Sequence, residues 1–212
     1  MTFSQILAAL ESAIARGLPG TAAHVHLAPV PRRQWPAGFD PARLRHAAGL
    51  LLVFPVDDRA HIVLTQRAHT LERHGGQISL PGGVVEPGET LERAALREAH
   101  EEVALPLDAV RIIGALTPID IPVSGFRLHP IVATAPARPP LHPADGEVAR
   151  ILDVAVDELL HPATFAVTVR SRDGLEVEAP AFRVGDAEIW GATAMVLAEF
   201  LALLGWTGPP KA

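Results

Sequence analysis

The sequence predicts an α/β fold in which helices and strands share one hydrophobic core. Apolar residues recur at helical spacing in 3–16, in 91–103 and in a segment that begins near 189. Apolar runs typical of strands occur at 47–56, 61–66, 110–116, 128–133, 151–156, 165–170 and 176–183. Hydrophobic residues make up 49% and charged residues 20% of the 212 positions, which excludes a disordered chain. No break in composition divides the chain, so we expect a single domain over residues 1–212.

The N-terminal part of the chain precedes a core that is rich in apolar runs. Residues 1–44 hold an amphipathic helix at 3–16, which Gly17 and Gly20 end, and a Pro-rich irregular connection in which His24 and His26 alternate as in a strand. The core occupies 45–204 and begins with a strand buried on both faces, 47–56, which turns at 57–59 into the strand 61–66. After the central helix, 117–125 is expected to be a loop, 157–160 a helical turn and 165–183 a second hairpin.

Residue types that are rare or missing exclude several kinds of chemistry. Without cysteine the chain has no thiol nucleophile, zinc-thiolate site or disulfide, and the cytoplasm is the expected compartment. The single lysine, Lys211, excludes Schiff-base chemistry and a phosphate loop of the Gly-Lys-Ser/Thr kind. The formal net charge of −6 argues against nucleic acid as the main partner, and the apolar runs are too short for a membrane span.

Three glutamates stand together on the helix at 91–103, for which Thr90 is the expected N-cap. At about 100° per residue, Glu98, Glu101 and Glu102 fall within one arc of about 100°. They repel one another unless a cation lies among them, and several carboxylates together suit Mg²⁺ or Mn²⁺, which take further ligands from water and substrate phosphates. The alternative is a solvated acidic helix face whose acids pair with nearby arginines.

The spacing over a longer stretch resembles the signature box of the Nudix hydrolases. The box residues, separated by five, seven and two positions, are Gly83, Glu89, Arg97-Glu98 and Glu101-Glu102. Two positions differ from the family, since Ala104 stands where a helix-ending glycine is usual and Ala99 replaces a larger apolar residue. Alanine adopts the left-handed C-cap less readily than glycine, so Ala104 is expected to change how the helix ends.

This resemblance implies an α/β/α sandwich with a mixed sheet between helices, and hydrolysis of a nucleoside diphosphate linked to another group. It gives the roles of metal ligand and catalytic residue to Glu98, Glu101 and Glu102, with Glu101 as ligand or base and Mg²⁺ or Mn²⁺ as cofactor. It adds the backbone carbonyl of Gly82 as a further ligand and Glu147 as a loop acid that serves as base or ligand. It also implies a salt bridge between Glu89 and Arg97 that holds the loop to the helix.

The residues before the box resemble, more narrowly, the coenzyme A pyrophosphatase subgroup of the Nudix hydrolases. The matching residues are Leu64, Thr65, Arg67, Ala68, Gly76 and Pro81-Gly82-Gly83, and IWGATA at 189–194 is similar to the C-terminal signature of that subgroup. The resemblance implies substrate binding by Arg67, Arg73, Gly76 and Gln77. Glu72 departs from it, because the subgroup has arginine there and this chain has one only at the next position, Arg73.

The substrate that this resemblance implies is coenzyme A or one of its thioesters, hydrolysed to 3′,5′-ADP and (acyl-)4′-phosphopantetheine. Glu72 would repel a nucleotide phosphate unless Arg73 takes over, which leaves ADP-ribose or another nucleoside diphosphate derivative as the alternative substrate. A non-catalytic nucleotide-binding domain is a lesser alternative, because such a domain would be expected to have lost carboxylates of the box. The expected partner is a nucleotide-derived small molecule, not nucleic acid or a membrane, and a homodimer is left open.

Overall fold

The computed structural model describes residues 1–68, 76–144, 146–172 and 175–209. Its helices are α1 (Phe3–Arg16), α2 (Thr21–His24), α3 (Leu91–Val103), α4 (Val156–Leu160) and α5 (Gly191–Leu203), with 3-10 turns at Pro41–Arg43 and Pro162–Thr164. The strands are β1 (Arg45–Val56), β2 (Arg59–Arg67), β3 (Ile78–Ser79), β4 (Gly82–Val84), β5 (Arg111–Ala115), β6 (Ile119–Ile121), β7 (Phe126–Thr134), β8 (Val148–Ala155), β9 (Phe165–Arg172), β10 (Leu175–Val184) and β11 (Ala187–Trp190). None of the helices in these ranges has the length and apolar character that a membrane span requires.

The larger of two sheets has eight strands and is built around β1. One edge of β1 pairs in parallel with β7, while the other edge pairs antiparallel with β4 near its start and with β2 near its end. β2 in turn pairs with β3 and β8, and β7 with β5 and β6. The sheet is therefore mixed, and the predicted hairpin of 47–56 and 61–66 is confirmed.

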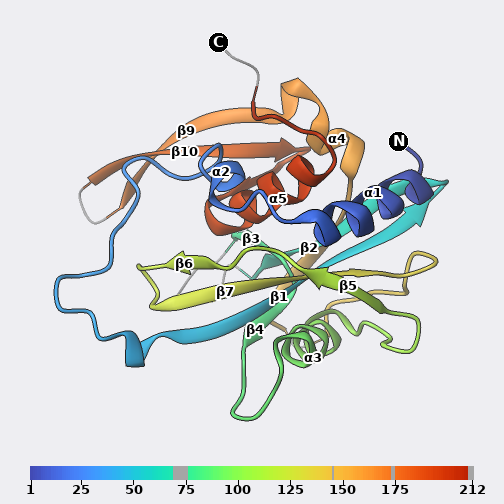
Figure 1. Ribbon diagram of the computed structural model, residues 1–212, viewed down its shortest axis with the longest axis horizontal. Coiled ribbons are helices and arrows are strands. Elements are labelled where there is room, and N and C mark those ends of the chain that lie inside the picture. Colours follow the sequence, from blue (N-terminus) through green and yellow to red (C-terminus); the bar gives the residue numbers. More distant parts are fainter. Residues whose placement is uncertain (69–75, 145, 173–174, 210–212) are drawn as a thin grey trace.

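Helices cover both faces of this sheet. Successive residues of β1 point to opposite sides, so β1 contributes apolar side chains to both faces. Leu50, Leu52 and Phe54 pack in one apolar cluster with the buried alanines of α3. Leu51 and Val53 belong to a second cluster that contains residues of α1 and α5. Figure 1 shows the result, with α3 below the sheet and α1 and α5 above it. The predicted α/β/α sandwich with a mixed sheet between helices is confirmed.

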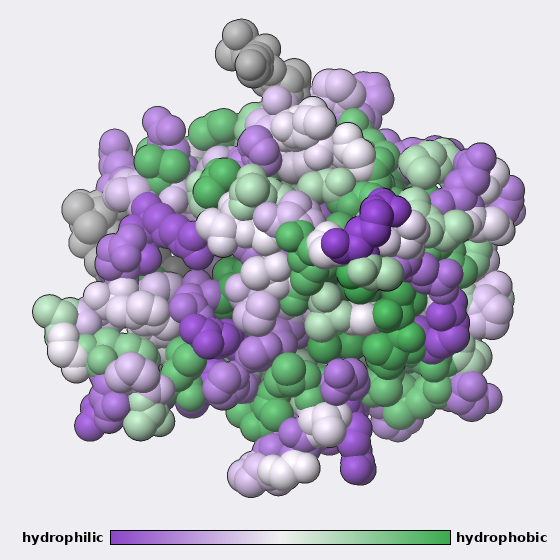
Figure 2. All heavy atoms as spheres, viewed as in Figure 1, coloured by the Kyte–Doolittle hydropathy of each residue, from purple (hydrophilic) through white to green (hydrophobic). Residues whose placement is uncertain are grey.

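A three-stranded sheet in the order β11-β10-β9 lies on the α5 side of the molecule. Phe182 of β10 and Ile189 of β11 are buried in the same cluster as α5, so the two sheets share a core. On the face drawn in Figure 2, hydrophilic side chains lie among hydrophobic ones, as is usual for a protein whose core is enclosed by its elements.

Three local expectations were wrong. The segment 117–125 contains the strand β6, and Ile189 and Trp190 end the strand β11, so that the last helix begins only at Gly191. The residues around His24 form the short helix α2 instead of an extended segment. His24 is buried there and its Nε2 lies 3.0 Å from Oε2 of Glu199 in α5, an interaction between segments far apart in the chain.

The helix α3 begins as expected at the N-cap Thr90, whose hydroxyl accepts a hydrogen bond from the N–H of Arg93 at 3.3 Å. Ala95, Ala99 and Val103 form its buried stripe. At its end Ala104 adopts the left-handed conformation, with φ 54° and ψ 35°, even though it is not glycine. The helix therefore ends at the usual place with an alanine held in a conformation that L-residues avoid.

We predict that Ala104→Gly stabilises the protein. Relief of the left-handed conformation, worth about 1–2 kcal/mol, exceeds the extra entropy of glycine in the unfolded chain, worth about 0.4–1 kcal/mol. The expected gain in unfolding free energy is therefore about 0.5–1 kcal/mol, measured by denaturant titration. Ala8→Gly is the matched control, because Ala8 is exposed inside the right-handed helix α1 and the same change there should lower stability by roughly 1 kcal/mol. Equal losses in both variants would contradict the account of Ala104.

Candidate functional site

The guanidinium of Arg97, in the middle of α3, is the centre of an ion-pair network. Its Nε and one terminal nitrogen donate to the two carboxylate oxygens of Glu89 at 3.0 and 3.1 Å, which confirms the expected salt bridge. The same terminal nitrogen donates to the carbonyl of Val84 at 3.0 Å. The other one donates to Glu98 at 2.9 Å and to Glu101 at 3.0 Å. The hydrogen bond from Arg97 lowers the pKa of Glu89, and Glu89 in turn raises the pKa of Arg97.

Glu98 lies directly over the backbone of Gly83 in β4. A Cβ atom added to Gly83 would stand 2.4 Å from the carboxylate carbon of Glu98 and 2.5 Å from each of its oxygens. The carboxylate therefore occupies the space that a side chain would take in any other residue. Its side chain is 17% exposed, and burial raises the pKa of Glu98 against the opposing effect of Arg97. A carboxylate held in this way gains from a nearby cation.

Glu102 is buried one turn further along α3 than Glu98, and its carboxylate is held by Gly82, the residue before Gly83. The N–H of Gly82 donates to Oε2 of Glu102 at 3.1 Å. A Cβ on Gly82 would lie 2.3 Å from the carbonyl oxygen of Ala48, so β4 can approach β1 here only with glycine. The two glycines thus serve different purposes, since Gly82 allows the close strand pairing and Gly83 leaves room for Glu98. The role of the Gly82 carbonyl as a ligand stays a prediction.

Arg67 and Glu147 meet at the ends of β2 and β8, next to Glu102. A terminal nitrogen of Arg67 lies 2.8 Å from Oε2 of Glu147, and the other lies 3.9 Å from Oε1 of Glu102. Backbone hydrogen bonds place Gly76 and Gln77 beside Arg67, since the N–H of Gly76 donates to the carbonyl of Arg67 and the N–H of Arg67 donates to the carbonyl of Gln77, both at 3.0 Å. Five predicted site residues from distant segments therefore lie together. Arg73 and Glu72 lie outside the described residues.

The residues at this site have the chemistry that a hard divalent cation requires. All candidate side-chain ligands are carboxylates, and the chain has no cysteine, so Mg²⁺ or Mn²⁺ suits the site better than a thiolate-bound metal. Glu101 is 53% exposed and faces solvent, whereas Glu98 and Glu102 lie against β4. In the ranges that the structure describes, no three such groups already converge on one point, and a nitrogen of Arg97 lies between Glu98 and Glu101. A cation at the site would therefore compete with Arg97 for these two carboxylates.

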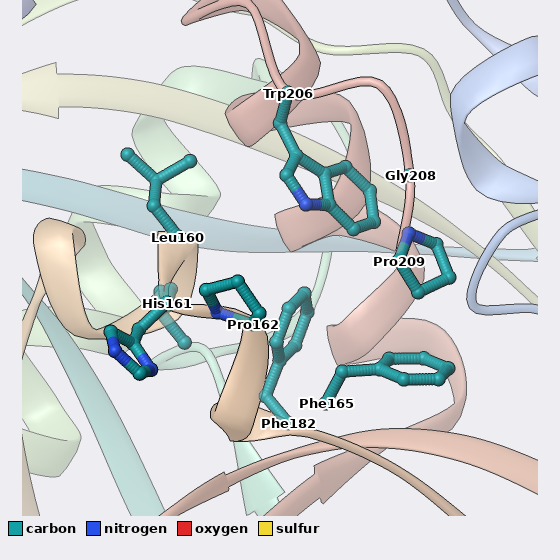
Figure 3. Close-up of a pocket in the computed structure, with 9 residues that line it drawn as sticks. Leu160, His161, Pro162, Phe165, Phe182, Trp206, Gly208 and Pro209 are labelled. Atoms are coloured by element: carbon teal, nitrogen blue, oxygen red, sulfur yellow. The ribbon is translucent and has the colours of Figure 1, made fainter. Parts of the chain in front are cut away.

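A separate cavity of about 190 Å³ lies between α4, β9, β10 and the residues after α5. Figure 3 shows Phe165, Phe182 and Trp206 turned toward it. Its helix α4 follows the end of β8 that pairs with the start of β2, whereas Arg67 lies at the opposite end of the same strands. None of the predicted site residues that the structure describes lines this cavity.

Two features of the site could not be seen in the sequence. The carbonyl of Val84 is an acceptor for Arg97, and backbone acceptors leave no trace in residue types. The pairing of Arg67 with Glu147 joins positions 80 residues apart and depends on the antiparallel register of β2 with β8. The presence of both residues was predicted, but their contact was not.

Proteins of one family resemble this chain in sequence and in fold. Residues 43–171 match the family described as NUDIX domain. A Cronobacter sakazakii protein named "Uncharacterized Nudix hydrolase NudL" is 37% identical over 145 residues, which are 68% of this chain and 75% of that protein. A protein of the same name from an Enterobacter species is 33% identical over 162 residues, 76% of this chain and 84% of that protein. The crystal structure of a MutT/nudix family protein from Enterococcus faecalis shares the fold, with a TM-score of 0.51 and 16% identity over 82% of this chain and 66% of that one.

We predict that Glu98→Gln stabilises the metal-free protein at neutral pH. Burial raises the folded-state pKa of Glu98, so folding favours the protonated form of its carboxyl group. The resulting contribution to stability is complete below the ordinary pKa of about 4.3 and is lost as the pH rises through the folded-state pKa. A glutamine cannot ionise and avoids this loss. Removing the buried negative charge of such an active-site carboxylate is expected to raise the unfolding free energy by about 1 kcal/mol at pH 7, and Tm by roughly 2–4 °C.

The check is thermal unfolding in chelator from pH 3.5 to 8. The two proteins should have the same stability at the acidic end and separate as the pH rises. Glu92→Gln, at an exposed position in the first turn of α3, is the control and should give no gain at any pH. A Glu98→Gln variant less stable than the parent at pH 7 would show that its bond to Arg97 outweighs the burial.

Proposed function

Because the chain belongs to the Nudix hydrolase family, we propose that it hydrolyses the pyrophosphate bond of coenzyme A or its thioesters to 3′,5′-ADP and (acyl-)4′-phosphopantetheine. The family establishes the broader activity, that of a pyrophosphohydrolase acting on nucleoside diphosphate derivatives with divalent metal ions. The coenzyme A substrate is the finer part of the proposal. A cytoplasmic location accords with such a substrate and with the absence of cysteine.

The observation that carries the proposal is the meeting of two sequence motifs. The residues Arg67, Gly76 and Gln77, from the segment that resembles the coenzyme A subgroup, lie together at the end of β2. Arg67 also reaches within 3.9 Å of Glu102 in the acidic box. A substrate phosphate at the box would thus be within reach of a guanidinium from the subgroup segment. Arginine suits this role because it binds phosphate through two nitrogens at once.

We assign the metal ligands to Glu98 and Glu102, with Glu101 as ligand or base and the carbonyl of Gly82 as a further ligand. When bound, Mg²⁺ or Mn²⁺ supplies charge to neutralise the pyrophosphate and lowers the pKa of water. The chain's own residues position the site. Arg97 aligns Glu98 and Glu101 from one nitrogen, and the N–H of Gly82 orients Glu102.

Glu147 is the second candidate for the base. Its side chain is 50% exposed and its carboxylate is bonded to Arg67. A substrate phosphate that draws Arg67 toward itself would weaken this ion pair, and the Glu147 carboxylate would then accept a proton from the attacking water more readily. Water adds to one phosphorus of the anhydride, and the bond from that phosphorus to the bridging oxygen breaks. Glu101 and Glu147 are distinguished by which substitution removes the acidic limb of the pH–rate profile.

The second candidate substrate is ADP-ribose or another nucleoside diphosphate derivative. Glu72 supports it, because a carboxylate stands where the coenzyme A subgroup has arginine. A non-catalytic nucleotide-binding role is disfavoured, since all carboxylates of the box are present and Arg97 joins three of them, Glu89, Glu98 and Glu101, in one network.

A panel of substrates tests the proposal. Purified protein with Mg²⁺ or Mn²⁺ is offered coenzyme A, dephospho-coenzyme A, ADP-ribose and NADH, and the products are identified by mass. We expect coenzyme A to be cleaved with the highest kcat/KM, with 3′,5′-ADP as a product. Rapid cleavage of ADP-ribose without cleavage of coenzyme A would replace the leading proposal with the second one. Binding of nucleotide without any turnover would favour the non-catalytic role.

We predict that Glu102→Gln lowers kcat by about 100-fold or more, because charge stabilisation at a metal site is worth roughly 3–4 kcal/mol. The variant should keep its fold, which circular dichroism checks, because glutamine can still accept the hydrogen bond from Gly82. Glu92→Gln on the exposed side of the same helix should keep nearly full activity. Near-normal turnover of Glu102→Gln would contradict the assignment of Glu102 as a ligand.

A further inference from the structure

The outer edge of the small sheet is open. In the part of the chain that the structure describes, β9 pairs only with β10, so the N–H and C=O groups along its other edge have no strand partner. Figure 1 shows β9 at the outer margin of the molecule, on the opposite side of the large sheet from α3. Such an edge is a template for pairing with another strand.

β9 lacks most of the devices by which proteins commonly protect an edge strand, although it contains two charged residues, Arg170 and Arg172. Its sequence, FAVTVRSR, contains no lysine and no proline. Its pairing with β10 runs from Phe165 to Arg172 without a register shift, so no bulge twists it away. Val167 and Val169 are 53% and 64% exposed, and Val169 is the most exposed large hydrophobic side chain among the described residues. Both valines lie on the same face of the strand, two positions apart.

We propose that two copies of the chain form a symmetric dimer by antiparallel pairing of β9 with β9, with the two-fold axis at Thr168. This register sets Val167 opposite Val169 of the partner subunit, and Val169 opposite the partner's Val167. Each exposed valine thereby meets another valine, the kind of cross-strand pair that stabilises a sheet. The two small sheets become one six-stranded sheet.

The pattern of β9 favours a second copy as the occupant because the strand complements itself. Shifting the register by one residue would bring the faces out of phase and set an apolar residue opposite Arg170, Val167 in one direction and Phe165 in the other. Shifting it by two would leave one valine of each copy without a valine opposite. The central register avoids both and sets Ala166 opposite the partner's Arg170.

The charges near this edge permit the pairing. Arg170 is engaged within its own chain, since it pairs with Glu188 of β11 and its guanidinium carbon lies 4.2 Å from the ring centre of Trp190. Thr168 also donates to Glu188 at 3.2 Å. In the central register no arginine faces the partner's arginine, so no like charges oppose each other across the new strand pair.

The expected dimer is weak and depends on concentration. One pair of eight-residue strands belongs to the class of interfaces that bury less than about 1,200 Å² in total, for which dissociation constants on the order of micromolar are usual. The free edge of β9 lies on the opposite side of the large sheet from α3, so the pairing should leave the hydrolytic activity of each copy unchanged. The proposal does not depend on the proposed substrate.

Sedimentation over a wide range of protein concentration gives the first test. The parent protein should pass from monomer to dimer, and Val169→Lys should raise the dissociation constant at least tenfold, because a lysine on the edge opposes pairing. Leu107→Lys is the matched control at an exposed apolar residue outside β9, and it should dimerise as the parent does. A parent protein that is monomeric at the highest concentration it reaches would overturn the proposal, as would a Val169→Lys variant that dimerises like the parent.

Disulfide cross-linking tests the register separately, and the chain has no cysteine of its own that could interfere. Val167→Cys and Val169→Cys proteins are oxidised separately and as an equal mixture. Directly opposite residues come close enough for a disulfide, whereas diagonal positions lie about 7–8 Å apart. The mixture should therefore form cross-linked dimer several-fold faster than either protein alone. Equal rates in all three samples would overturn the assignment of the two-fold axis to Thr168.

Discussion

Arg97 donates hydrogen bonds to Glu89, Glu98, Glu101 and the carbonyl of Val84 at distances between 2.9 and 3.1 Å, and the rest of the acidic site depends on this sharing. A guanidinium is rigid and planar, so fixing two of its nitrogens on the loop also fixes the third beside the helix. The loop before α3 and the acidic face of α3 thus form one unit. Without the positive charge of Arg97, Glu98 and Glu101 would repel one another and turn toward solvent.

The backbone of β4 imposes the second constraint. Gly82 lets β4 approach β1 and holds Glu102 through its N–H, while Gly83 leaves open the space in which Glu98 lies. Burial under these conditions raises the pKa of Glu98, so the site is less stable without a cation than with one. Active sites that must bind charge commonly lower the stability of an enzyme in this way.

The sequence predicted those parts that depend on local patterns. The limits of α3, its cap at Thr90 and the buried hairpin of β1 and β2 follow from periodicity and capping, and the Glu89–Arg97 bond was implied by the resemblance to the Nudix signature box. The strands β6 and β11 were missed because three and four residues are too few to establish an alternation. The contact of Arg67 with Glu147 was missed because it arises from strand register, which the packing of the whole sheet decides.

Direct binding of Mn²⁺, followed by electron paramagnetic resonance, tests without any substrate whether Glu98, which lies over Gly83, helps to hold a divalent ion. Gly83→Ala would place a methyl group where the Glu98 carboxylate lies, and we expect it to weaken Mn²⁺ binding by about tenfold or more. Gly49→Ala adds the same group to the neighbouring strand β1, 3.3 Å from the side chain of Leu80, and should leave the affinity unchanged. Equal Mn²⁺ affinity in the parent and in folded Gly83→Ala would contradict the account.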